Sequence, residues 1–234
     1  MTLRAILILL ASVAFAVSPF LNPEFGGFDP ERYPIPQRNP PVQPAGYAFA
    51  IWGIIYLWLL LSAVIGVWRH RADPAWDAAR WPLFVSLAVG SFWLPVALIS
   101  PVWATVMIWV MLAGALLAML RAQAAGPAWA LSLPLGLYAG WLSAASFVSV
   151  GLLGAGYGVL FAETSWAVIA LSLALAFAFF IQRHAYGIWT YGLAAAWGFA
   201  AIAVANLNDA ALLAAFAGVA ATLIFVFAVL PLRR

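Results

Sequence analysis

Long apolar blocks separated by short polar connections dominate the chain. All but the first block are free of charged residues, and most approach the ~17–25 residues that a membrane-spanning helix needs. Lipid cannot satisfy exposed backbone groups and the strict alternation of a membrane barrel is absent, so the blocks predict helices. The sequence therefore predicts an all-α, polytopic membrane bundle of about eight transmembrane helices. The blocks are Thr2–Ser18, Ala45–Trp68, Trp81–Ile99, Pro101–Leu120, Trp129–Val150, Ser165–Ile181, Gly187–Ala205 and Ala210–Leu230.

Composition agrees with this class and excludes several others. Of 234 residues, 67% are hydrophobic and 7% charged, whereas soluble domains carry roughly 25% charged residues. The absence of cysteine excludes disulfides and thiolate metal sites, and the absence of lysine excludes a Schiff-base retinal site. The net charge of +3 does not indicate nucleic-acid binding, because the arginines occupy the ends of apolar blocks and form no stripe.

The distribution of arginine predicts the orientation. With the N-terminus inside, the inner side carries most of the arginines, whereas the outer side carries two together with acidic residues. This positive-inside bias predicts cytoplasmic N- and C-termini. The inner set is Arg4, Arg69, Arg71, Arg80, Arg121, Arg183, Arg233 and Arg234, and the outer set is Arg32 and Arg38 with Glu24, Asp29 and Glu31.

Two segments near the N-terminus each allow two interpretations. The long outer loop, residues 19–43, is rich in proline and is expected to be extended or turn-like. It fits either a lid over the mouth of a bundle or a stiff connector. The first apolar block, with Arg4 and the run Ala14–Ala16, fits either a first transmembrane helix or a cleavable signal peptide.

Ionisable groups are expected at the ends of the helices and not within the membrane. Glu163 and Asp209 fall at predicted outer ends, and His70 and His184 at inner ends. Catalysis, ion coupling and axial ligation of a haem iron usually need such groups in the interior. We therefore expect no enzyme, no metal site and no required cofactor.

Aromatic residues are the unusual resource of this chain. Phe49, Trp52 and Tyr56 recur three and four residues apart, so their rings fall on one side of a helix. A helix surface that faces lipid needs only to be apolar, and Leu or Ile would meet that need equally well. Three rings on one face instead suggest a flat pocket for an aromatic ligand.

The fifth block repeats this spacing and adds small residues. Tyr138, Trp141 and Ala145 follow the same i, i+3, i+7 pattern, and Ser149 extends that face. A neighbouring face carries Gly136, Gly140 and Ala144, a small-xxx-small series that lets another helix approach closely. The glycines between residues 151 and 158 predict a flexible turn after this block.

These motifs resemble the TspO/MBR family of tryptophan-rich sensory proteins, in its longer bacterial form. The family's second helix has a proline-aromatic entry followed by Trp-x-x-x-Tyr, its third Asn-x-x-Trp, and its fifth Tyr-x-x-Trp-x-x-x-Ala-x-x-x-Asn. Gly90 and Ser149 stand at the two Asn positions of this chain. The matching residues are Pro44, Tyr47, Phe49, Trp52 and Tyr56, then Trp93, then Tyr138, Trp141 and Ala145.

The resemblance implies a five-helix unit over residues 1–152 and three additional spans over residues 153–234, in a bacterial inner (cytoplasmic) membrane. Family members bind tetrapyrroles such as protoporphyrin, and some bind sterols, in a pocket under the first loop. The implied function is a sensor or carrier that binds a flat hydrophobic ligand. The implied ligand-binding residues are Tyr47, Phe49, Trp52, Tyr56, Trp93, Tyr138, Trp141, Ala145 and Ser149.

Two other functions stay open at this point. A transporter of a small apolar or zwitterionic solute would use the three extra helices to complete a path, although the sequence contains no internal repeat that supports it. A structural or assembly subunit would pack its aromatic residues against a larger membrane complex. Besides the hydrophobic ligand, membrane lipid and a homo-oligomeric or larger complex are the expected partners.

Overall fold

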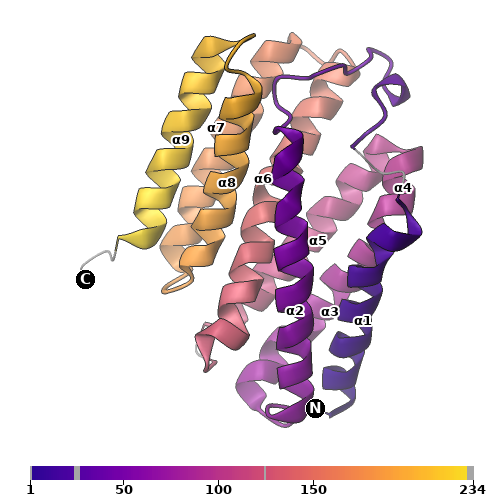
Figure 1. Ribbon diagram of the computed structural model, residues 1–234, viewed down its shortest axis with the longest axis vertical. Coiled ribbons are helices and arrows are strands. Elements are labelled where there is room, and N and C mark those ends of the chain that lie inside the picture. Colours follow the sequence, from indigo (N-terminus) through magenta and orange to yellow (C-terminus); the bar gives the residue numbers. More distant parts are fainter. Residues whose placement is uncertain (1, 24–26, 124, 231–234) are drawn as a thin grey trace.

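Each apolar block of the sequence forms a helix in the computed structural model, which describes residues 2–23, 27–123 and 125–230 (Figure 1). Within this part of the chain no residue is in a β-strand. Short 3₁₀ turns η1 (Pro30–Arg32), η2 (Gly46–Ala50) and η3 (Ala128–Ala130) lie in the connections. The helices are α1 (Thr2–Leu21), α2 (Ile51–Trp68), α3 (Pro74–Ser91), α4 (Trp93–Ile99), α5 (Pro101–Arg121), α6 (Ser132–Gly156), α7 (Glu163–His184), α8 (Trp189–Ala205) and α9 (Ala211–Val229).

The predicted polytopic helical bundle is confirmed. Among the described residues, six helices are long and apolar enough to cross a membrane, and there are seven such spans, against the eight predicted, if α3 and α4, which meet at a bend of 43°, are counted as one span. The bend lies at Phe92, where Pro95 has no N–H to donate to the carbonyl of Ser91. The seventh block of the sequence forms α8, which is shorter, at 17 residues.

Several helix boundaries differ from the prediction, among them the end of α1 and the start of α3. Helix α1 continues through Pro19 to Leu21, so the long loop begins later than residue 19. Helix α3 begins at Pro74, well before Trp81, because the Asp73 side chain accepts a hydrogen bond from the N–H of Ala75 (2.9 Å). Asp at the N-cap followed by proline is a strong start signal for a helix.

Helix α6 is the centre of the bundle. It contacts α2, α5, α7 and α8, and 83% of its most apolar window is buried. In Figure 1, α8 and α9 lie on one side of α2, and α1 and α4 lie on the other. The aromatic residues of α6 are therefore at the meeting point of the N-terminal and C-terminal helices.

Small residues of α6 allow this central packing. A Cβ at Gly140 would overlap the backbone carbonyl of Tyr191, and one at Gly136 would overlap Ile188. The predicted close approach of a helix is confirmed, and the neighbour is α8. The predicted turn begins later than expected: α6 continues to Gly156, whose missing side chain leaves room for the ring of Tyr33, and Gly158 lies in the turn that follows.

The two ends of the bundle differ in charge. One end, here called the arginine end, carries Arg4 at the start of α1. The guanidinium of Arg4 pairs with the carboxylate of Asp77 of α3 at 2.6 Å. Trp76 is buried there, and its ring stacks on that of His70. A hydrogen bond from His70 lowers the pKa of Asp73. Arg233 and Arg234 lie outside the described residues.

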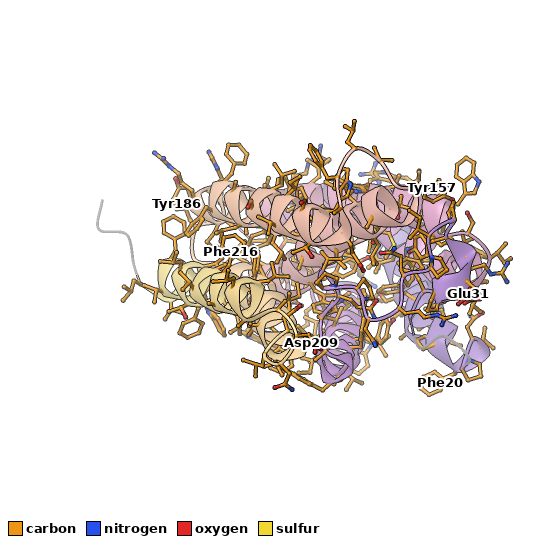
Figure 2. All side chains as sticks on the ribbon, turned by 90° about the horizontal axis from the view of Figure 1, so that it is seen from above. Phe20, Glu31, Tyr157, Tyr186, Asp209 and Phe216 are labelled. Atoms are coloured by element: carbon orange, nitrogen blue, oxygen red, sulfur yellow. The ribbon has the colours of Figure 1, made fainter. Side chains whose placement is uncertain are left out.

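The opposite end, here called the loop end, is covered by the segment between α1 and α2. In the view from above (Figure 2), Glu31 of this segment and Tyr157, which follows α6, lie on the same side of the picture, away from Tyr186. Backbone bonds fix the segment to the bundle: the N–H of Ile35 donates to Gly156 (2.9 Å). Tyr33 is 4% exposed, and burial raises its pKa.

Candidate functional site

A cavity of about 490 Å³ lies at the loop end of the bundle. Its size is within the roughly 300–1,000 Å³ of small-molecule sites. Residues from α1 to α6, from the loop segment and from α8 line it. Its aromatic lining consists of Phe15, Phe28, Phe49, Trp52, Tyr56, Trp93 and Trp141.

Rings from α2 and α6 form one wall of this cavity. Trp52 and Tyr56, one helical turn apart, stack with centroids 5.4 Å apart and planes 17° apart. Trp141 meets Trp52 edge-on at 6.3 Å, and it meets Phe49 edge-on at 5.9 Å. Stacked and edge-to-face pairs are the favourable aromatic arrangements, so each ring fixes the orientation of its neighbour.

Most of the sequence-predicted residues meet at this cavity. The predicted residues that line it are Phe49, Trp52, Tyr56, Trp93, Trp141, Ala145 and Ser149. The structure thus brings residues of α2, α4 and α6 to one place. Their contact with a ligand stays a prediction.

The two remaining predicted residues lie outside the lining. Tyr138 is fully buried behind the wall, where its hydroxyl and that of Ser86 are 2.9 Å apart. Its ring supports Trp52 at a centroid distance of 6.3 Å. Tyr47 belongs to η2, is 49% exposed, and packs against Trp197 of α8. These two tyrosines contact other residues around the cavity from outside its lining, and their contact with a ligand stays a prediction.

The indole N–H groups divide into two classes. Several tryptophans use theirs within the protein: Trp58 donates to Trp129, Trp76 to Gly126, Trp93 to Ala104, Trp166 to Val159 and Trp197 to Ala48, each to a backbone carbonyl. In the cavity, Trp52 and Trp141 have no acceptor among the described residues, and the hydroxyl of Tyr56 has no partner there either. The cavity therefore presents unused hydrogen-bond donors.

The described lining of the cavity carries no charged side chain. Its polar side chains are Ser18, Asn22, Gln43 and Ser149. Ser18, Asn22 and Ser149 each donate a hydrogen bond to a backbone carbonyl of the protein. The hydroxyl of Ser149 donates to the carbonyl of Ala145 at 2.9 Å. Across the described ranges, no three His, Cys, Asp or Glu residues are grouped so that they could hold a metal ion. The chemistry that the lining offers is aromatic stacking and neutral hydrogen bonding, with donors on the tryptophans and both donors and acceptors on the amide side chains.

Comparison with known protein families identifies the family of this chain. A family model described as "TSPO-like protein" matches residues 3–230. The chain belongs to the TSPO-like family. No curated protein and no solved structure shows significant similarity to it. The match includes α7, α8 and α9, and the division of the chain at residue 152 stays a prediction.

Sequence reasoning did not find the contribution of α8 to this TSPO-like cavity. Gly198 and Ile202 of α8 line it, and the indole of Trp197 donates to Ala48 at the start of the aromatic wall (3.0 Å). Asn206 at the end of α8 donates to Pro41 of the loop (2.9 Å). Gly and Ile carry no motif, so the sequence contains no signal for these contacts.

Phe15 of α1 is a second lining residue that the sequence did not reveal. It packs edge-on against Tyr56 at a centroid distance of 5.0 Å. A Cβ at Gly90 would lie 2.6 Å from its ring. Gly90 stands where the TspO/MBR pattern has Asn, so in this member the ring of Phe15 occupies the space beside that position.

We expect Gly90→Ala to destabilise the protein by about 1–3 kcal/mol, because the new methyl group forces the ring of Phe15 to move within a packed site. Thermal unfolding in detergent measures the loss. Phe15→Leu combined with Gly90→Ala is expected to recover part of it. Gly53→Ala is the control, since a Cβ at Gly53 meets no atom within 4 Å. Equal stability of Gly90→Ala and wild type would contradict this account of Phe15.

Proposed function

We propose that this protein is a membrane receptor or carrier for a flat hydrophobic ligand, and that the ligand is a tetrapyrrole such as protoporphyrin. The observation that carries the proposal is the aromatic wall formed by Trp52, Tyr56 and Trp141 on one side of a cavity of about 490 Å³. Flat rings gain both apolar burial and ring–ring contact on such a wall. Membership of the TSPO-like family supports the same proposal.

The chemistry of the lining supports binding without catalysis. General acid–base catalysis needs a titratable group within hydrogen-bond reach of the reacting atom. The described lining contains no carboxylate, imidazole or amine, and its titratable side chain, Tyr56, is of a type whose ordinary pKa of about 10 makes it a poor base near neutral pH. We therefore propose a sensor or carrier and not an enzyme.

The depth of the cavity favours a receptor over a transporter. Its lining on α2 ends at Tyr56. Further along α2, toward the arginine end, Leu59 and Ala63 are buried in the core with Leu83 of α3. A transporter would have to open this packed half. In the membrane, we propose that the arginine end faces the cytoplasm, so that the cavity lies toward the outer side.

Porphyrin binding to a double variant tests the proposal. We expect saturable binding of protoporphyrin to the wild type in detergent, and an affinity loss of about tenfold or more in Trp52→Leu/Trp141→Leu, because two ring–ring contacts of ~0.5–1.5 kcal/mol each are lost. The shift of the porphyrin absorbance band reports binding independently of the number of tryptophans.

A matched control removes two tryptophans elsewhere. Trp103 and Trp189 are 64% and 42% exposed and lie outside the lining, so Trp103→Leu/Trp189→Leu should bind as the wild type does. Equal porphyrin affinities of the wild type and Trp52→Leu/Trp141→Leu would contradict the proposed binding site.

A further inference from the structure

We infer that the cavity selects an uncharged form of its flat ligand, one that presents hydrogen-bond acceptors and buries no carboxylate. This inference rests on the proposed function and specifies the chemical class of the ligand. It follows from two properties of the described lining: the absence of a cation and the presence of unused neutral donors.

The cavity offers nothing that would neutralise an acid. The described lining contains no arginine or histidine. The loop segment that covers the loop end carries two arginines, and each is already beside a carboxylate: Arg38 pairs with Glu31 at 2.6 Å, and Arg32 lies 3.6 Å from Asp29. A buried carboxylate without a cationic partner is strongly disfavoured. A carboxylate group of a ligand that entered this lining would therefore lose more hydration than the lining returns.

Neutral acceptors fit the cavity better. Trp141 is only 3% exposed, yet its indole N–H has no acceptor among the described residues. Trp52 and Tyr56 present further donors on the same wall, stacked on each other. Indole donates and cannot accept, so a ligand with ester carbonyls or ring nitrogens would complete these bonds. These donors are not among the fully buried polar atoms that lack a partner, but a ligand that covered them would bury them, and buried donors are normally satisfied.

A comparison of the affinities of protoporphyrin and its dimethyl ester separates the effect of ligand charge from that of ligand shape. The two molecules share the flat ring and differ in whether their two acid groups ionise. The protein is placed in phosphatidylcholine nanodiscs, and nanodiscs without protein correct for partitioning into lipid. We expect the ester to bind at least about tenfold more tightly than the diacid at pH 7.5. This ratio should shrink as the pH falls toward 4.5, where the carboxyl groups become protonated.

Equal binding of the two compounds, or tighter binding of the diacid, would overturn the inference and leave the proposed function standing. Failure of both compounds to bind would instead overturn the proposed tetrapyrrole function, and the inference with it. Tighter binding of the ester with no pH dependence of the ratio would also contradict the inference, because the preference would then not arise from ionisation.

Removal of single donors tests the second half of the inference. Trp141→Phe keeps a ring in the wall but deletes the N–H, and it should weaken binding of the ester about two- to tenfold. Tyr56→Phe, which deletes only a hydroxyl, should act similarly and is the milder change. Trp109 is the matched control: it also lacks an acceptor among the described residues, but it lies outside the cavity against Phe147. Unchanged ester affinity in both cavity variants would exclude these donors from ligand recognition.

Discussion

Gly140→Val is expected to destabilise the bundle by about 3 kcal/mol or more. The added side chain would overlap the backbone carbonyl of Tyr191, and its Cβ would also lie 2.9 Å from the carbonyl carbon. A backbone group cannot rotate away as a side chain can, so α8 itself must move from α6. Overpacking that forces a backbone shift falls at the upper end of measured costs.

Reversible unfolding in detergent, followed by circular dichroism, measures this loss. Gly218→Ala in α9 is the control, because the nearest atom to a Cβ at Gly218 is the Ala203 Cβ, at 3.9 Å. Alanine there should be neutral or stabilise the protein by up to ~1 kcal/mol, since it favours helix over glycine. If the two variants proved equally stable, the close contact between α6 and α8 would not be a determinant of this fold.

The same substitution should also impair the cavity. Helix α8 contributes Gly198 and Ile202 to the lining, and its Trp197 is bonded to Ala48 beside the aromatic wall. Separation of α8 from α6 would therefore open one side of the site. The three C-terminal helices, which the sequence offered as an addition to a five-helix unit, thus include a structural part of the cavity.

The membrane helices could be predicted from the sequence because the cause is local. A segment in lipid must satisfy its own backbone, so an apolar block of sufficient length forms a helix whatever its neighbours are. The early start of α3 needed only the capping signal of Asp73 and Pro74, which lies outside the apolar block. The end of α6 was missed for a different reason: Gly154 and Gly156 support close contacts with Trp166 and Tyr33, which no local pattern reveals.

The candidate site was predictable only in part. Helical spacing shows which residues share a face, but it does not show how deep that face lies. Tyr138 and Trp141 share one side of α6, yet the first is fully buried behind the wall and the second lines the cavity. Tyr47 precedes α2 in a 3₁₀ turn, where the periodicity of an α-helix no longer applies. Phe15 and Ile202 reach the site through long-range packing and have no motif of their own.

Substitution of Arg80, whose guanidinium is buried, is expected to cause the second large loss of stability. Arg80 is 5% exposed. It donates to the backbone carbonyls of His70 (2.7 Å) and Arg71 (2.9 Å), and it lies 3.1 Å from a carboxylate oxygen of Asp77. A weaker bond reaches Gly66, in the last turn of α2 (3.4 Å). A cation at this position caps the orphan carbonyls at the C-terminal end of α2 and joins the turn to α3.

We expect Arg80→Met to cost about 3–5 kcal/mol, because it removes the donor to the carbonyls of Arg71 and Gly66 and leaves the largely buried carboxylate of Asp77 with one partner fewer. The carboxylate keeps its bond to Arg4 at 2.6 Å, so the loss should fall toward the lower end of this range. Unfolding in detergent measures it. Arg38→Met is the control: its pair with Glu31 is solvent-exposed, and such pairs contribute ~0–1 kcal/mol.

Arg80→Lys separates the charge of this group from its shape. Lysine keeps the positive charge, but its ammonium group cannot reproduce the planar fork that reaches carbonyls on both sides of the turn. If the fork matters, Arg80→Lys should lose a large part of what Arg80→Met loses. Stability equal to the wild type would show that charge alone suffices, whereas an Arg80→Met variant within ~1 kcal/mol of the wild type would contradict the role of Arg80 altogether. The cavity lies at the opposite end of the bundle, so ligand affinity at a temperature where both variants are folded should stay unchanged.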